Sequence, residues 1–271
     1  MTVVPGLYAV DTSVEVCMAR LPFVRAAGST APARGQRNKE LESSSWRAAC
    51  LHQGHHPEDG EPVYGERDAV DIEKMRSLGL PFWLAGGTGS PNGLREALAA
   101  GANGVQVGTL FAFCEESGFS DEIKREVLER ASRGEVDVHT DPLASPTGYP
   151  FKVVKWKGDS SEQVRERKCD LGYLRVAFRR GDGRVDYRCA AEPVEDYVRK
   201  GGAIADTVGR RCLCNALTAN IGQAQVRPGG VEEAPLVTSG DDLATIATFL
   251  RGRTSYTASE VIDHLLSPVA A

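Results

Sequence analysis

Two glycine-rich turns are the first places in this sequence where residue type and spacing point to chemistry. Gly86-Gly87-Thr88-Gly89 follows the apolar run Leu80–Ala85, and Gly108-Thr109 follows a shorter run that begins at Gly104. Glycine lets a backbone approach an anion closely, and N–H groups at the start of a following helix point their positive ends toward it. Two such turns side by side would hold a phosphate group. The alternative is that both are ordinary tight turns between a strand and a helix.

The pattern around these turns alternates between helix and strand. The spacing of apolar residues predicts a helix over 68–78, a strand over 80–85, a helix over 91–100 and a strand over 104–109. Ser90 stands where an N-cap belongs, and Pro91 where the first helical residue belongs. Short connections in such an alternation imply parallel strands, so both turns should lie at one edge of an α/β sheet.

The pattern changes after Ser117, where we predict a domain boundary. Further elements are predicted as a helix over 121–132, a strand over 151–156, helices over 241–250 and 258–266, and short N-terminal strands over 3–10 and 21–27. A long tract rich in glycine and charged residues separates the later elements.

The residues around the turns also resemble a known family. The run Leu80-Pro-Phe-Trp-Leu-Ala-Gly-Gly-Thr-Gly-Ser-Pro-Asn-Gly-Leu-Arg95, continued by Ala-Leu-Ala-Ala-Gly-Ala-Asn-Gly-Val-Gln-Val-Gly-Thr109, is similar to the nitronate monooxygenases, also called 2-nitropropane dioxygenases. Gly60–Asp68 resembles the stretch that precedes this region in bacterial members. Glu192–Tyr197 and Arg210–Asn215 resemble a C-terminal extension of one subgroup.

The resemblance implies an FMN-dependent TIM barrel whose glycine turns hold the flavin phosphate. In that family the flavin oxidises a bound alkyl nitronate, and reaction with dioxygen gives a carbonyl compound and nitrite. The cofactor-binding residues that the resemblance implies are Ala85, Gly86, Gly87, Gln106, Gly108 and Thr109. The expected partners are therefore a small-molecule substrate and dioxygen.

The resemblance departs from the family at its catalytic histidine. The family motif Ala-Gly-Gly-His-Asn-Ala-Pro-Pro-Arg-Gly aligns best with Ala26–Gly35, which puts Ser29 at the histidine position. A hydroxyl cannot replace an imidazole as a base near neutral pH. His52, His55 and His56 follow in a polar segment. Either one of these histidines acts as the base at the site, with His55 as the candidate, or all three face solvent.

The number of residues that precede the second turn limits how many barrel strands this chain can supply. A complete eight-stranded barrel needs roughly 250 residues, yet only 109 residues reach the end of the presumed eighth strand. We therefore expect an α/β fold made of a partial, C-terminal half of a flavin-type TIM barrel (1–117) and a C-terminal mixed α/β extension (118–271). Its open strand edge would need cover from the extension, from residues 1–60 or from a second copy.

Composition excludes several functional classes. Of 271 residues, 41% are hydrophobic and 25% charged, the net charge is −5, and no apolar run approaches the roughly 18 residues of a membrane span. We expect a cytoplasmic globular protein that binds neither nucleic acid nor membrane. Seven cysteines favour reduced thiols. Cys169, Cys189, Cys212 and Cys214 lack the familiar zinc spacing, so buried free thiols are favoured over a metal site.

Three functions remain open at this stage. The first is an FMN-dependent nitronate monooxygenase. The second is a flavin-dependent enoyl reductase, because related barrels share the phosphate turns. The third is a truncated, non-catalytic remnant with a binding role, which Ser29 and the short barrel favour.

The residue at position 29 gives a test of the alignment. Without a base, the protein should oxidise preformed nitronate better than neutral nitroalkane, and Ser29→His should raise turnover of the neutral form by up to about 10²- to 10⁴-fold. Nitrite released from each form by wild type and variant measures this. Efficient wild-type turnover of neutral nitroalkane would show that another residue, such as His55, is the base.

Overall fold

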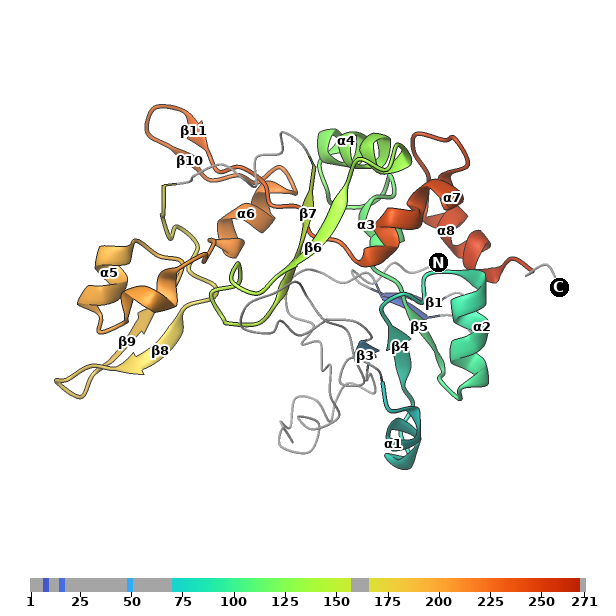
Figure 1. The fold of residues 1–271 in the computed structure, drawn as a ribbon, viewed down its shortest axis with the longest axis horizontal. Helices are drawn as coiled ribbons and strands as arrows, with labels where there is room; N and C mark the ends of the chain where they lie inside the picture. Colours follow the sequence, from blue (N-terminus) through green and yellow to red (C-terminus); the bar gives the residue numbers. More distant parts are fainter. Residues whose placement is uncertain (1–6, 10–14, 18–47, 51–69, 157–165, 269–271) are drawn as a thin grey trace. The chain divides into compact units, whose positions relative to one another are not determined.

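The computed structural model describes residues 7–9, 15–17, 48–50, 70–156 and 166–268 (Figure 1). Ser29, His52, His55, His56 and the predicted strand over 21–27 lie outside the described residues. Within the described part, no helix is both long enough and apolar enough to span a membrane.

The chain forms two compact units, each a mixture of helices and short strands. The first comprises Met1–Ser117, Lys124–Gly134 and Ser239–Ala271, and the second comprises Gly118–Ile123 and Glu135–Thr238. The first segment of the first unit ends at Ser117, and two later segments of the chain return to this unit. The C-terminal helices therefore belong with the glycine turns rather than with the extension.

The first unit contains the predicted parallel sheet. Its strand order is β3-β4-β5, formed by Ala48–Cys50, Trp83–Ala85 and Gly104–Gln106, and both pairs of strands are parallel. All three β4 side chains are buried. The two helices of the predicted alternation are α1 (Ile72–Ser77) and α2 (Pro91–Ala99). The helix, strand, helix, strand prediction is confirmed.

The helix-capping preferences that predicted these elements are seen in the structure. The Ser90 hydroxyl accepts the Gly93 N–H at 3.0 Å, so Ser90 caps α2 as expected. Gly79 has φ +63° directly after the last turn of α1, the conformation that glycine adopts most readily at a helix end. An antiparallel pair, β1 (Leu7–Ala9) and β2 (Glu15–Cys17), lies near the N-terminus.

Five further helical segments belong to the first unit, except for Asp121–Ile123 at the start of α4, which belongs to the second. They are α3 (Thr109–Ala112), α4 (Asp121–Ser132), η4 (Asp241–Thr245), α7 (Ile246–Leu250) and α8 (Ala258–Leu266). The helix predicted over 241–250 begins as a 3₁₀ turn and continues as α-helix. Tyr256 is buried between these helices, and its hydroxyl donates to the Leu110 carbonyl at 2.8 Å. This bond ties α8 to the chain that leaves β5.

The second unit is built from hairpins and short helices. Its elements are β6 (Asp137–Asp141), β7 (Phe151–Lys155), β8 (Val176–Arg179), β9 (Val185–Arg188), α5 (Val194–Arg199), η3 (Ile204–Thr207), α6 (Leu213–Ala219), β10 (Val226–Arg227) and β11 (Val231–Glu232). Each strand pair is antiparallel. The predicted strand over 151–156 forms as β7. The others escaped prediction because runs this short carry little periodicity.

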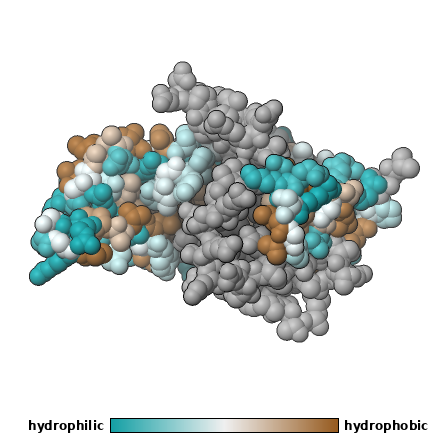
Figure 2. Space-filling view, turned by 90° about the horizontal axis from the view of Figure 1, so that it is seen from below, coloured by the Kyte–Doolittle hydropathy of each residue, from teal (hydrophilic) through white to brown (hydrophobic). Residues whose placement is uncertain are grey.

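Apolar side chains of this unit pack in a buried cluster. One cluster consists of Val153, Leu213, Ala216, Leu217 and Leu236. Several large apolar side chains of the unit stay exposed, among them Tyr173, Val185 and Ile204. Figure 2 shows hydrophobic and hydrophilic residues mixed over the described surface. Polar contacts also stabilise this unit.

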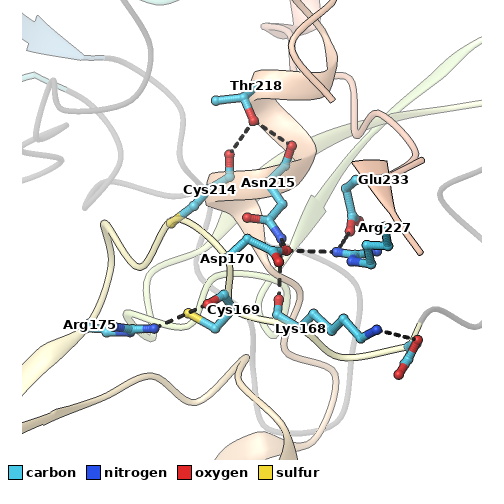
Figure 3. A network of polar contacts seen from close by, with 10 residues as sticks. Lys168, Cys169, Asp170, Arg175, Cys214, Asn215, Thr218, Arg227 and Glu233 are labelled. Carbon is cyan, nitrogen blue, oxygen red and sulfur yellow. Dashed lines mark hydrogen bonds and ion pairs between the residues drawn. The ribbon is translucent and has the colours of Figure 1, made fainter. Parts of the chain in front are cut away.

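A polar network around Arg227 supplies such contacts (Figure 3). The Arg227 guanidinium lies 2.6 Å from the Glu233 carboxylate and 3.0 Å from the Asp170 carboxylate. The Asn215 side-chain amide donates to the same Asp170 oxygen at 2.6 Å. Strand β10, helix α6 and the loop at Asp170 are thereby joined through one carboxylate.

Removal of this cation should destabilise the protein. The side chains of Arg227 and Glu233 are only 10% and 6% exposed, so Arg227→Met removes the guanidinium that neutralises a buried carboxylate and should cost about 3 kcal/mol of unfolding free energy. The matched control is Arg199→Met, whose ion pair with Asp196 is exposed and should cost less than about 1 kcal/mol. Urea unfolding measures both. Equal effects would refute a structural role for the network.

Candidate functional site

The register of the sheet places both glycine turns at one edge. β4 and β5 run parallel, with Ala85 opposite Gln106 in the last position of each strand. The next residues of both chains therefore leave the sheet at the same end. The structure brings together Ala85, Gly86, Gly87, Gln106, Gly108 and Thr109 at this edge.

The first turn depends on glycine for its backbone conformation. Gly86 and Gly87 have φ values of +85° and +69°. Two consecutive residues in this left-handed region are strained for any residue with a Cβ atom. Gly87 is exposed, whereas Thr88 is buried and its hydroxyl donates to the Leu84 carbonyl at 3.4 Å. The turn therefore presents backbone, not side chain, at its exposed end.

Helix α2 packs tightly onto this turn. A Cβ atom at Gly93 would lie 2.8 Å from the Thr88 carbonyl oxygen and 2.9 Å from the Thr88 Cα. Only glycine permits this approach, which seats the first turn of α2 directly on the strand-to-helix connection. The glycine at position 93 thus serves packing and not ligand binding.

The second turn contains an exposed glycine, Gly108, and a hydrogen-bonded hydroxyl group, that of Thr109. Gly108 is exposed, and among the described residues no atom lies within 4 Å of a Cβ built on it. Thr109 is 5% exposed, and its Oγ1 accepts the Gly240 N–H at 3.1 Å and lies 3.4 Å from the Ser239 hydroxyl. The Thr109 hydroxyl is therefore held in place by the backbone and side chain of the 239–240 segment.

The sequence did not predict that the segment after β11 forms part of this edge. Ser239 and Gly240 contact Thr109 across 130 positions of sequence, and a Cβ atom at Gly240 would lie 2.9 Å from Thr109 Oγ1. The Asp242 carboxylate lies 3.2 Å from the position of a Cβ on Gly89. That carboxylate fills the space beside Gly89. No local sequence pattern could have revealed these contacts.

Cys114 lies five residues after Thr109 in the buried core. Burial raises the pKa of its thiol to about 11, and the nearby Glu116 carboxylate acts in the same direction. A protonated thiol is a poor nucleophile. Cys114 is therefore not a candidate nucleophile at this edge. The proposed base positions, Ser29 and His55, lie outside the described residues, so their placement stays a prediction.

Comparison with known proteins supports the resemblance found in the sequence. Residues 52–141 match the family model described as nitronate monooxygenase. The chain is 34% identical over 156 residues to the nitronate monooxygenase of Pseudomonas aeruginosa, covering 55% of this chain and 41% of that protein. It is 31% identical over 121 residues to a probable nitronate monooxygenase of Bacillus subtilis, covering 45% and 32%. The chain thus spans less than half the length of either relative.

Solved structures give a weaker likeness. The FabK structure from Thermotoga maritima aligns with 88% of this chain and 57% of its own, at a TM-score of 0.46 and 19% identity. The enoyl reductase domain of MlnA from Bacillus amyloliquefaciens aligns with 96% and 71%, at a TM-score of 0.43 and 13% identity. Likeness at this level supports no conclusion about fold or reaction.

Adding a single methyl group at position 93 tests the contact between α2 and the first turn. Gly93→Ala should destabilise the protein by about 1–3 kcal/mol, because the overlap with the Thr88 backbone outweighs the better helix propensity of alanine. Asn92→Ala, on the exposed side of the same turn, is the control and should change stability by less than about 0.5 kcal/mol. Thermal or urea unfolding measures both. A stabilising Gly93→Ala would contradict the close approach.

Proposed function

We propose, from the premise that this chain is a partial member of the nitronate monooxygenase family, that it is a flavin-dependent oxidoreductase. In the specific form of the proposal, FMN is the cofactor, and alkyl nitronates react with dioxygen to give a carbonyl compound and nitrite. The observation that carries the proposal is the parallel register of β4 and β5, which brings the turns of the family-matched segment to one sheet edge.

The residues at this edge fit a phosphate group. Gly87 and Gly108 are exposed, and a Cβ atom on Gly108 would meet open space among the described residues. Gly86 and Gly87 hold a left-handed backbone that exposes main-chain groups instead of side chains. A bulky residue at either position would fill the space that an anion needs.

Each implied residue has a distinct role in this proposal. The N–H groups of Gly87 and Gly108 donate to phosphate oxygens, and the Thr109 hydroxyl donates its remaining proton. Ala85 and the half-buried Gln106 end the two strands and fix where the turns begin. When bound, FMN supplies the redox chemistry that accepts electrons from the substrate and passes them to dioxygen.

Ser29 restricts the substrates that fit this proposal. If it stands in place of the family's histidine, the protein lacks a strong base near the flavin. A preformed nitronate anion needs no proton removed from carbon, so it suits such a site better than a neutral nitroalkane. His55 is the alternative base.

The barrel is also part of the proposal. β3, β4 and β5 supply three parallel strands, which would form the C-terminal part of a flavin-type TIM barrel. A partial barrel has an open parallel edge, and a second copy of the chain could cover it, giving a homo-oligomer. A cytoplasmic location and the absence of nucleic-acid and membrane partners remain predictions.

Two glycine variants with the same backbone strain test the phosphate site. Gly87→Val should weaken FMN binding by at least about tenfold, because its side chain fills the anion space as well as straining a φ of +69°. Gly79→Val is the matched control: its φ is +63° and its Cβ would meet nothing within 4 Å, so it should lose comparable stability but keep FMN affinity. Fluorescence titration of FMN measures binding, and urea unfolding measures stability.

Each outcome of this experiment points to one function. Bound FMN with nitrite release from nitronates supports the proposal. Bound FMN with reduction of enoyl thioesters and no nitrite would favour the enoyl reductase alternative. Wild-type protein that binds no FMN at micromolar concentrations would refute the proposal and favour a non-catalytic binding role. Equal loss of FMN in both glycine variants would refute the phosphate site alone.

A further inference from the structure

The second unit contains a cavity that is lined by a β-hairpin and a helix. Strands β8 and β9 form the hairpin, and α5 follows β9 along the chain and lies beside it (Figure 1). The cavity has a volume of about 660 Å³, which is within the size range of small-molecule sites. Its lining residues fall within 178–201, so the cavity belongs to the second unit and shares no residue with the glycine turns.

The lining of this cavity carries an excess of positive charge. Among the described residues, Asp186 is the one acidic residue that lines it. The whole chain has a net charge of −5, so this local excess is opposite in sign to the overall balance. A concave surface lined by cations attracts anions through the summed field of its charges. The basic residues of the lining are Arg179, Arg180, Arg188, Arg199 and Lys200.

Arg188 is held where the hairpin meets the end of α5. Its guanidinium donates to the Lys200 carbonyl at 3.0 Å. The guanidinium carbon lies over two aromatic rings, 4.8 Å from the centre of Phe178 and 5.2 Å from that of Tyr197. In the described part of the chain the guanidinium makes this one hydrogen bond and no ion pair. Its other N–H groups are therefore free to bind phosphate oxygens from a fixed, planar fork.

Lys200 positions Arg188 instead of binding the anion itself. The Lys200 ammonium lies 2.8 Å from the Glu192 carboxylate, whose side chain is only 3% exposed. Removing one partner of such a buried ion pair is costly, so Lys200 stays with Glu192. The pair holds the residue that ends α5, and with it the carbonyl that orients Arg188.

Arg180 and Arg199 can turn to a ligand because their own ion pairs are exposed. The Arg180 guanidinium lies 3.4 Å from the Asp186 carboxylate and 4.0 Å from that of Asp182. Arg199 pairs with Asp196, its neighbour on α5. The two arginine side chains are 55% and 71% exposed. Ion pairs in contact with water are weak, so a multiply charged anion in the cavity can replace these carboxylates.

We propose that this cavity binds a small organic diphosphate, such as a nucleoside diphosphate. Arg188 binds phosphate oxygens, and Arg180 from the hairpin and Arg199 from α5 neutralise the remaining charge. Cations on two separate elements suit a ligand with two charged groups better than a single phosphate ion. The half-buried Phe178 side chain offers an apolar surface to a base, and the volume exceeds what an inorganic ion fills. This site is independent of flavin binding in the first unit.

Calorimetric titration of the full-length protein tests the class of ligand. The probes are ADP, inorganic pyrophosphate and adenosine. ADP and pyrophosphate should both bind, with ADP tighter by about threefold because its base contacts the aromatic ring, and adenosine should not bind detectably. The affinity for ADP should fall as KCl is added, because salt screens the charges that attract the ligand. Gly87→Val protein should bind ADP as wild type does, which separates this cavity from the flavin site.

Matched variants locate the site on the hairpin and the helix. Arg180→Met and Arg199→Met should each weaken ADP binding by about tenfold, because each removes a charge-assisted contact. Arg184→Met is the control: it removes one positive charge from the same hairpin, but Arg184 does not line the cavity, so affinity should change less than about twofold. Asp186→Asn should tighten ADP binding by about threefold, because it removes the acidic charge of the lining. Circular dichroism checks the folding of each variant, and a misfolded protein would not gain affinity.

Several results would overturn the proposal. One is wild-type protein that binds neither ADP nor pyrophosphate at millimolar concentrations. Another is an equal loss of affinity in Arg180→Met and Arg184→Met, which would show a general effect of charge and no site. Loss of ADP binding in Gly87→Val would place the diphosphate at the turns of the first unit. Binding of single-stranded RNA without binding of ADP would make this cationic surface a nucleic-acid interface instead.

Discussion

The pairing of β4 with β5 is the constraint on which the candidate site depends. Strands that run parallel and end in register must deliver their following turns to the same sheet edge, and Ala85 opposite Gln106 does this. All three β4 side chains are buried, so both faces of the strand that leads into the first turn are covered. Gly86, Gly87 and Gly108 then meet because of a pairing, not because of their own sequence.

The C-terminal segment makes this edge rigid. Thr109 is held by Ser239 and Gly240, and Leu110 by the Tyr256 hydroxyl, so both residues that follow Gly108 are anchored from far along the chain. Helix α8 packs against α2 and α3, the helices that follow the two turns. A site built from backbone groups needs such support, because glycine turns have no side chains of their own to order them.

The second unit is stabilised by polar contacts in addition to its apolar cluster. The Asp170 carboxylate, shared by Arg227 and Asn215, fixes the approach of loop and helix. That contact also fixes the loop that contains Cys169 against α6.

The sequence by itself determined the local elements of the first unit and their order. The apolar strands, the Ser90 cap and the glycine after α1 follow from periodicity and backbone preference, which act over a few residues, and the resemblance around both turns rests on the same contiguous stretch. Only the tertiary structure decided what meets across long separations. Gly240 reaches Thr109 over 131 positions and Asn215 reaches Asp170 over 45, contacts that no local pattern encodes, because they depend on how the two units fold. The cysteines show the same limit: their spacing fits no familiar metal motif, and only the fold decides how deeply each thiol is buried.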